Sequence, residues 1–214
     1  MFVKICGITD REAAQAAVAA GADALGFVFA ASPRQVSAEI AREIAADVPR
    51  STLRVAVFHH PPRAHFAHVL AVFAPDWVQT DAEDLASLPV PAGTFVLPVF
   101  RSGGGGSGGS GFRRDQESRL KPLLQAFQPL PSRLLYEGPR SGTGTAADWT
   151  EAQKLAAATE VVLAGGLSAA NIEAAVAQVR PWGIDVSTGV ERAPGRKDPD
   201  KIRAFVARAR ALEH

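Results

Sequence analysis

The chain opens with Phe2-Val-Lys-Ile-Cys6, continues through an alanine-rich stretch that ends near Gly21, and then gives Ala24-Leu-Gly-Phe-Val-Phe29. The two short apolar runs are typical of buried strands, and the alanine-rich stretch between them is typical of a helix. A strand, a helix and a second strand in this order form a βαβ unit with parallel strands. This stretch decides the fold, because the same alternation recurs along the whole chain.

Eight such runs predict eight strands, at residues 2–6, 24–29, 53–58, 76–80, 94–100, 134–137, 160–164 and 183–186. We expect a helical segment after each strand, with a short one at 82–88 and one near 148–158 that follows a loop. Eight repeats favour an α/β fold of the (β/α)8 TIM barrel type, with parallel strands in a single domain over residues 1–211. An open doubly wound sheet is the alternative, but the Gly-x-Gly-x-x-Gly that usually follows its first strand is absent.

Capping residues support these boundaries. Thr9-Asp-Arg-Glu12 predicts a capping box at the first helix, Gly21 its end, and Asp198-Pro199 the start of the last helix. Asp148 is interpreted as a helix cap. Ser168 is expected near the start of the helix that follows the seventh strand.

Composition excludes several classes of function. The 214 residues carry 23 basic and 22 acidic side chains, so a net charge of +1 gives no field that would hold nucleic acid or an anionic membrane. The single cysteine excludes an intrachain disulfide and a thiolate zinc cluster, and it fits the reducing cytoplasm, where we expect the protein. No export signal or spanning helix is expected.

Two segments are set apart from the predicted core. Residues 102–111 contain only glycine and serine, which predicts a flexible loop on the catalytic face; a tolerated insertion is favoured over a lid. Residues 212–214 are interpreted as a possible remnant of an affinity tag.

Cys6 lies where the first strand ends. A lone cysteine is more often a small buried hydrophobe than a reactive group. However, catalytic residues of barrels sit at the carboxyl ends of strands, and strand alternation places Lys4 on the same face as Cys6. A nearby cation lowers the pKa of a thiol, so Cys6 becomes a candidate catalytic group.

The last two strands end in loops suited to phosphate. Gly165 and Gly166 follow the seventh strand, and Ser187-Thr-Gly189 closes the eighth. Glycines let backbone amides approach an anion, the hydroxyls of Ser187 and Thr188 add donors, and a helix amino terminus adds partial positive charge. Ordinary turn glycines, with Ser168 as a helix cap, are the alternative.

Charged residues at other strand ends complete the candidate site. Glu137 and Asp185 are candidate acid or base groups, and Arg34 could pair bidentately with a substrate carboxylate. The histidines at 59, 60, 65 and 68 could suggest a metal, but no carboxylate–histidine pattern completes a site, so none is predicted.

Five motifs together resemble the phosphoribosylanthranilate isomerases, and the resemblance spans nearly the whole chain. They are Lys4-Ile-Cys-Gly-Ile-Thr9, Gly21 to Phe29, Ser32-Pro-Arg34, Leu163-Ala-Gly-Gly-Leu167 and Asp185-Val-Ser-Thr-Gly-Val-Glu191. The resemblance implies a (β/α)8 barrel that needs no metal or organic cofactor. It also implies an Amadori rearrangement in tryptophan biosynthesis, from N-(5-phosphoribosyl)anthranilate to 1-(2-carboxyphenylamino)-1-deoxyribulose 5-phosphate.

The resemblance also implies roles for single residues. Cys6 matches the general base that removes the proton from ribose C2, and Arg34 matches the residue that holds the anthranilate carboxylate. Asp185 matches the residue that contacts the ribose hydroxyls, and the loops at 165–166 and 187–189 match the phosphate site. The general acid of the family is an aspartate, and the matching position here is Glu137.

The chain departs from the family pattern at two strands. Glu137 is longer than the family aspartate by one methylene, and the loop after it differs while it keeps a Gly-Thr-Gly ending. At the fourth strand the family commonly has Gln-Leu-His-Gly, whereas this chain has Gln79-Thr-Asp-Ala82. A role for Gln79 is therefore left open.

Two rival functions are weighed. The related barrel isomerase of histidine biosynthesis performs the same rearrangement with two aspartates and binds two phosphates, and Cys6 argues against it. A non-catalytic barrel that binds a sugar phosphate is the other rival. The expected partner is a small phosphorylated substrate, and the protein is expected to be a monomer or a homodimer.

Overall fold

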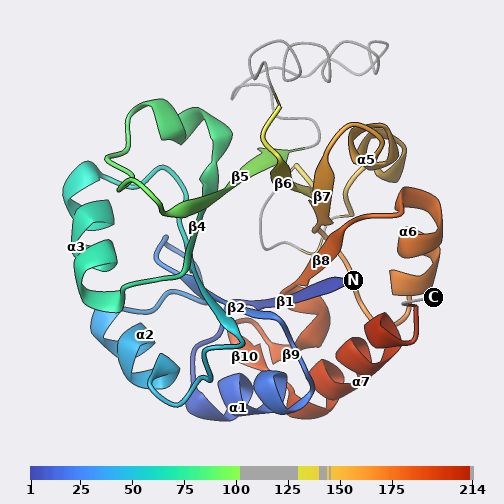
Figure 1. The fold of residues 1–214 in the computed structure, drawn as a ribbon. Coiled ribbons are helices and arrows are strands. Elements are labelled where there is room, and N and C mark those ends of the chain that lie inside the picture. Colours follow the sequence, from blue (N-terminus) through green and yellow to red (C-terminus); the bar gives the residue numbers. More distant parts are fainter. Residues whose placement is uncertain (102–129, 140–143, 145, 213–214) are drawn as a thin grey trace, which may run out of the picture.

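Parallel strands close into a barrel that is surrounded by helices (Figure 1). The computed structural model describes residues 1–101, 130–139, 144 and 146–212. The elements run β1 (Phe2–Cys6), α1 (Arg11–Ala19), β2 (Ala24–Val28), α2 (Ala38–Ala45), β3 (Leu53–Val57), α3 (Arg63–Phe73), β4 (Trp77–Asp81), η1 (Ala82–Ala86), β5 (Phe95–Arg101), β6 (Arg133–Glu137), α5 (Trp149–Ala156), β7 (Glu160–Leu163), α6 (Ile172–Val179), β8 (Gly183–Val186), η2 (Thr188–Val190), β9 (Glu191–Ala193), β10 (Arg196–Lys197) and α7 (Pro199–Arg210). The barrel order is β1 to β8 in sequence, so the predicted (β/α)8 fold is confirmed.

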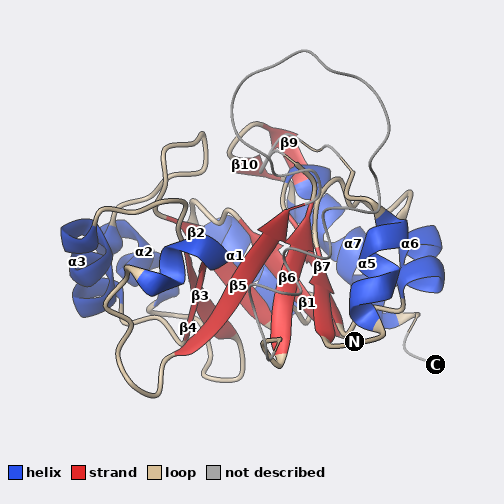
Figure 2. Cartoon of the chain, turned by 90° about the horizontal axis from the view of Figure 1, so that it is seen from above, coloured by secondary structure: helices blue, strands red, loops and turns tan. Residues whose placement is uncertain are grey.

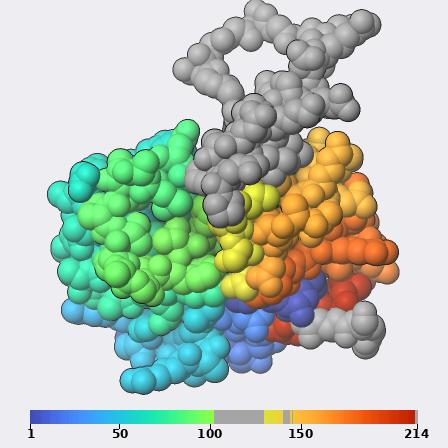
Figure 3. All heavy atoms as spheres, turned by 45° about the horizontal axis from the view of Figure 1, so that its top comes forward, coloured from blue at the N-terminus to red at the C-terminus, as the bar shows by residue number. Residues whose placement is uncertain are grey.

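The barrel closes where the first and last strands pair. β1 and β8 are parallel, with Phe2 opposite Gly183 and Lys4 opposite Asp185. Nearby, the Arg210 Nη1 donates to the Met1 carbonyl at 2.7 Å. The space-filling view shows the first and last parts of the chain side by side, blue against red (Figure 3). Closure removes the open sheet edges on which unpaired backbone groups would lie.

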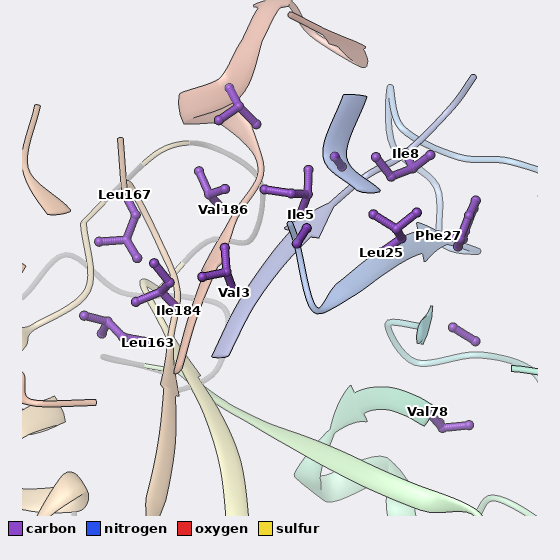
Figure 4. Packing of buried hydrophobic residues seen from close by; sticks show 14 of the residues in the cluster. Val3, Ile5, Ile8, Leu25, Phe27, Val78, Leu163, Leu167, Ile184 and Val186 are labelled. Atoms are coloured by element: carbon purple, nitrogen blue, oxygen red, sulfur yellow. The ribbon is translucent and has the colours of Figure 1, made fainter. Parts of the chain in front are cut away.

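The two faces of each strand pack differently. Val3, Leu163 and Ile184 point outward from three neighbouring strands and lie together in the apolar layer between sheet and helices (Figure 4). The inward-facing residues form a separate buried cluster of Leu97, Val99, Leu135, Val162 and Ala164. The barrel interior is therefore filled with side chains, as expected of eight strands.

An aromatic layer fills the end of the barrel at which the strands begin. Phe2 stacks on Trp77 and on Trp182, with ring centroids 5.4 and 4.8 Å apart. The guanidinium of Arg133 lies 3.4 Å from the centroid of the Trp182 ring, in a cation–π contact. β5 and β6 point away from this end, toward the side on which β9 and β10 lie (Figure 2).

Most predicted boundaries are confirmed to within one residue, and the differences lie at caps. Asp10, not Thr9, caps α1, because its side chain accepts from the Ala13 amide. Asp148 and Asp198 cap α5 and α7 as expected. The helix after β7 begins at Ile172, not near Ser168, because the Asn171 side chain bonds the Ser168 amide and shapes a turn there.

Some features were not predicted or cannot be compared. The segment at 82–88 is a 3₁₀ helix over Ala82–Ala86, and the two-stranded sheet of β9 and β10 was not expected. The glycine–serine loop at 102–111 lies outside the described residues, as do residues 213–214. None of the helices in the described part of the chain has the length and apolar character needed to cross a membrane.

Candidate active site

A cavity of about 400 Å³ opens at the carboxyl ends of the strands. The structure brings into its lining all the predicted site residues except Gly189: Cys6, Arg34, Glu137, Gly165, Gly166, Asp185, Ser187 and Thr188. Gly189 serves packing instead, because a Cβ there would lie 2.0 Å from the Leu167 carbonyl oxygen. It lets the loop after β8 press against the loop after β7.

Cys6 lies beside a buried ion pair. The Lys4 Nζ donates to Asp185 Oδ1 at 2.8 Å, across the seam between β1 and β8, and Lys4 is fully buried. A Cβ built on Gly26 would be 3.0 Å from both the Cys6 Sγ and the Lys4 Nζ. The thiol and the ammonium group therefore converge over the bare backbone of β2.

The electrostatics of Cys6 differ from the sequence expectation. Burial is the largest influence and raises the pKa of the thiol above its ordinary value; Lys4 acts in the opposite direction, and Asp185 adds to the rise. Burial also disfavours the charged form of Lys4, but Asp185 and then Cys6 raise its pKa. The expected lowering of the thiol pKa by Lys4 is thus outweighed, because Lys4 is already shared with a carboxylate in a dry site.

Arg34 is held by a carboxylate from the closing motif. Its Nε and Nη2 donate to Glu191 at 2.7 and 2.8 Å, and Lys197 Nζ reaches the same carboxylate at 2.9 Å. Burial tends to raise the pKa of Glu191, but Arg34 and Lys197 lower it below the ordinary value. Glu191 therefore occupies one bidentate edge of Arg34, formed by Nε and Nη2, and no described residue bonds the other edge, which Nη1 forms with the second hydrogen of Nη2.

Lys197 also supports the loop after β8. Its ammonium group donates to the Ser187 carbonyl at 3.0 Å and to the Ser187 hydroxyl at 3.2 Å. Burial lowers the pKa of Lys197, and Glu191 opposes that effect. The sequence analysis did not single out Lys197 as a site residue. The one available sign was its position six residues after Glu191, and the short β9–β10 sheet brings these two residues together.

The loop after β7 is shaped by glycines that side chains could not replace. Gly165 and Gly166 have φ of +86° and +66°, in the left-handed region. A Cβ on Gly166 would also lie 2.7 Å from the Gly144 carbonyl oxygen. Because α6 begins at Ile172, its amino terminus is not part of the cavity lining. The loop glycines, the hydroxyls of Ser187 and Thr188, and the start of η2 at Thr188 are the donors on this side of the cavity.

Glu137 belongs to a charged row that sequence reasoning missed. Arg101 donates from Nη1 to the Glu137 carboxylate and from Nε to Asp81 Oδ1 at 2.9 Å, and its Nη2 lies 2.7 Å from the same Asp81 oxygen in an ion pair. Asp81 in turn lies 2.5 Å from the Nδ1 of His59 through its other oxygen. Asp81 lies at one of the positions where the strand-four motif departs from the family pattern. This departure was the one sign in the sequence that could have pointed to the charged row.

The histidines are placed differently from one another. Ligand atoms of His59, His60 and Asp81 lie within 4.8 Å, so the structure does supply the carboxylate that the sequence pattern lacked. Each group already has a protein partner, since His60 Nδ1 lies 2.7 Å from Asp84 Oδ1. His65 Nε2 instead lies 3.0 Å from the Phe29 carbonyl oxygen. The absence of a metal stays a prediction.

Gln79 also lines the cavity. It is buried, and its Oε1 accepts no hydrogen bond from the described residues. A buried acceptor without a partner is costly unless a ligand or water donates to it. Gln79 thus offers a contact for a substrate hydroxyl or amine.

A family model described as N-(5'-phosphoribosyl)anthranilate (PRA) isomerase matches residues 3–208, nearly the whole chain that builds this cavity. The chain belongs to the PRA isomerase family. The resemblance drawn from the five motifs is confirmed, and with it the prediction of a PRA isomerase of tryptophan biosynthesis.

Relatives in the PRA isomerase family match over their full length. The isomerase of Pelobacter propionicus is 40% identical over 95% of this chain and 93% of its own. That of Rubrobacter xylanophilus is 37% identical over 98% of both chains. Among solved structures, the Thermus thermophilus isomerase has a TM-score of 0.80 at 32% identity, with both chains covered completely.

Two further solved structures of PRA isomerases bear on ligand and assembly. One holds reduced 1-(o-carboxyphenylamino)-1-deoxyribulose 5-phosphate, and it has a TM-score of 0.79 at 30% identity over 99% of this chain and 100% of its own. The other consists of monomers generated from the dimeric Thermotoga maritima isomerase, with the same TM-score, identity and coverage.

Proposed function

We propose that Cys6 and Glu137 are the base and the acid with which this chain isomerises N-(5-phosphoribosyl)anthranilate. The carrying observation is that both side chains line one cavity together with Arg34, Asp185 and the two glycine-containing loops. The acid protonates the furanose oxygen, so the ring opens to a cationic Schiff base. The base then removes the proton from C2, and the resulting enamine becomes the ketose.

The buried thiol suits the second step. Burial raises the pKa of the Cys6 thiol, and a thiolate whose parent thiol has a higher pKa is a stronger base, so the step uses the thiolate form of Cys6. The Schiff base places a positive charge next to C2, which acidifies C2 and favours the thiolate. Lys4 adds a second positive charge, and it is held in place by Asp185.

Binding of the substrate would use the remaining donors. Arg34 has Nη1 and the second hydrogen of Nη2 to offer the anthranilate carboxylate, so we propose that it holds this group through the edge that Glu191 leaves free. Asp185 Oδ2 is placed for a ribose hydroxyl, because Lys4 bonds Oδ1. The phosphate would lie between Gly165–Gly166 and Ser187–Thr188, and Gly189 would serve by allowing the two loops to pack.

The decay of anthranilate-linked fluorescence, after enzyme is added to freshly prepared substrate, measures the reaction directly. Cys6→Ser should lower kcat by ~10²-fold or more and leave KM nearly unchanged, because the hydroxyl keeps the size of the thiol and loses its acidity. Unchanged kcat in this variant would refute the base assignment.

Glu137→Gln tests the acid in the same assay. The amide keeps the shape of the carboxyl but has no proton to donate, so kcat should again fall by ~10²-fold or more. Near-normal turnover would remove Glu137 from the mechanism. The binding-module alternative predicts no decay even for the parent enzyme, and activity on the histidine-pathway intermediate alone would favour the other rival.

Assembly and location are part of the proposal. The dimeric Thermotoga maritima relative supports a homodimer, and light scattering of the purified chain distinguishes it from a monomer. We also propose that residues 1–211 act as one domain, that the enzyme works in the cytoplasm, and that the two proton transfers need no metal or cofactor.

A further inference from the structure

Four consecutive strands end in side chains that contact one another around the cavity mouth. His59 follows β3, Asp81 ends β4, Arg101 ends β5 and Glu137 ends β6. Arg101 donates hydrogen bonds to both Asp81 and Glu137, and a further hydrogen bond joins Asp81 to His59. This row reaches the proposed acid from the side opposite Cys6.

Arg101 is the centre of the row. Its planar guanidinium uses Nε and Nη2 on Asp81 and Nη1 on Glu137, so one cation is shared by two carboxylates. The side chains of Asp81, Glu137 and Arg101 are 6%, 11% and 17% exposed. Solvent therefore screens these contacts only weakly, and the rigid fork fixes the direction of each bond.

We propose that Arg101 is a positioning residue for the Glu137 carboxyl group, and that Asp81 keeps Arg101 shared between the two carboxylates. This inference rests on the proposed role of Glu137 as the acid. It supplies a physical reason for the tolerance of a glutamate where the family has an aspartate. The longer side chain has an additional rotatable bond, and a fixed cation selects one of its positions.

The proposal also implies an effect of the row on proton uptake by Glu137, which a titration can test. A neighbouring cation favours the carboxylate form. Asp81 shares the Arg101 cation with Glu137, so it reduces the stabilisation that Arg101 gives to the Glu137 carboxylate. Of the other described parts of the barrel near Glu137, β7 and the residue after it contribute apolar Val162 and Ala164, while Lys4 and Asp185 of β1 and β8 are paired with each other.

The test compares Arg101→Gln, Asp81→Asn and the double variant in the full-length enzyme. Carboxyl ¹³C NMR of glutamate-labelled protein follows the titration of Glu137, which is assigned by its absence in Glu137→Gln. Arg54→Gln is the matched control, because Arg54 makes a similar pair with Asp76 at the opposite end of the strands.

We expect opposite shifts from the two charges. Arg101→Gln should raise the midpoint of the Glu137 titration by about one pH unit, and Asp81→Asn should lower it. In the Arg101→Gln background, Asp81→Asn should lose most of its effect, because it acts through Arg101. The control should leave the midpoint in place. A midpoint that does not respond to Arg101→Gln, or that moves in the same direction in both variants, would overturn the proposal.

Kinetics supply the second readout. Arg101→Gln should lower kcat by ~10²-fold with KM changed much less, because a displaced carboxyl group is poorly aligned with the furanose oxygen.

If Arg101→Gln does not fold, Arg101→Lys replaces it, since this variant keeps the charge and loses the planar guanidinium. Arg101→Lys should lower kcat and leave the midpoint of the Glu137 titration nearly unchanged. Full activity of Arg101→Lys would contradict the positioning role. Normal turnover of Glu137→Gln would instead refute the acid assignment, while the titration would still report on the contact.

Discussion

At the scale of the residue, the cavity places Cys6 in a dry environment next to a lysine that is already paired. The position of Cys6 was predictable, because strand alternation and the carboxyl end of β1 follow from the order of residues alone. Its protonation was not predictable, because burial and the Lys4–Asp185 pair depend on the approach of β8, 181 residues from Lys4 along the chain. The binding geometry of Arg34 was likewise not predictable, because Glu191, which occupies one edge of its guanidinium, is 157 residues away along the chain.

The close packing over Gly26 leads to a prediction. A Cβ at this position would lie 3.0 Å from the Cys6 Sγ and from the Lys4 Nζ, and 3.1 Å from the Lys4 Cε. Gly26→Ala should therefore displace the base and lower kcat by at least ~10-fold, while overpacking costs about 1–3 kcal/mol of unfolding free energy. Fluorescence decay and urea unfolding measure the two effects. Gly26 lies in a strand without a positive φ, so backbone strain is not the cause, and unchanged kcat in a folded variant would contradict the prediction.

At the scale of the element, the barrel strands were predictable and the small β9–β10 sheet was not. Continuous apolar runs of about four to seven residues are recognisable as buried strands, as in β7 and β5. β9 and β10 have three and two residues, which is too short for such a signal. They matter for the site, because they bring Glu191 and Lys197 against Arg34 and Ser187.

The start of α6 shows a second limit at this scale. Ser168 is a good capping residue by type, yet Asn171 immediately precedes the helix, and its side chain bonds both the Ser168 amide and the Gly166 carbonyl. Ser168 and Asn171 are both candidate caps, and the conformation of the loop between them determines at which of the two the helix begins. The conformation of the loop after β7, and with it the donors that the loop offers, therefore could not be predicted from residue types alone.

The network around Glu191 predicts a stability that depends on pH. Arg34 and Lys197 lower the pKa of Glu191 from its ordinary value of 4.5, so their stabilisation is complete above that pH and is lost as the pH falls through the lowered pKa. Glu191→Gln should reduce the free energy of unfolding by about 3 kcal/mol at pH 7, because it leaves two buried cations without a counter-charge. Urea unfolding should show that the difference in unfolding free energy between the variant and the parent becomes smaller below about pH 4. A difference that stays constant down to pH 3 would show that the ionised pairs are not its cause.

At the scale of the whole molecule, barrel closure explains why motifs at the two ends of the chain predicted one site. Strands β1 to β8 are neighbours in the order of the sequence, so the loops after β1, β2, β7 and β8 meet around one mouth. A prediction of the fold was therefore enough to bring Cys6, Arg34 and Asp185 together. The opposite side of the mouth was less accessible to sequence reasoning, because Arg101 and Asp81 there follow no motif of the family.

The ion pair at the barrel seam leads to a last prediction, which separates stability from activity. Lys4 is fully buried, and Asp185, its only carboxylate partner among the described residues, is nearly so. Lys4→Met removes one charge and leaves the other uncompensated, which should cost about 3–5 kcal/mol of unfolding free energy. Adding Asp185→Leu replaces the pair by apolar side chains, and such replacements are often neutral, so the double variant should recover most of that loss. Its isomerase activity should stay at least ~10²-fold below the parent, because the thiol has lost its neighbouring cation and the ribose its carboxylate. Urea unfolding and fluorescence decay are measured on the same preparations. A double variant as unstable as Lys4→Met would show that barrel closure needs the ion pair. A double variant with the activity of the parent would show that the reaction does not need the ion pair.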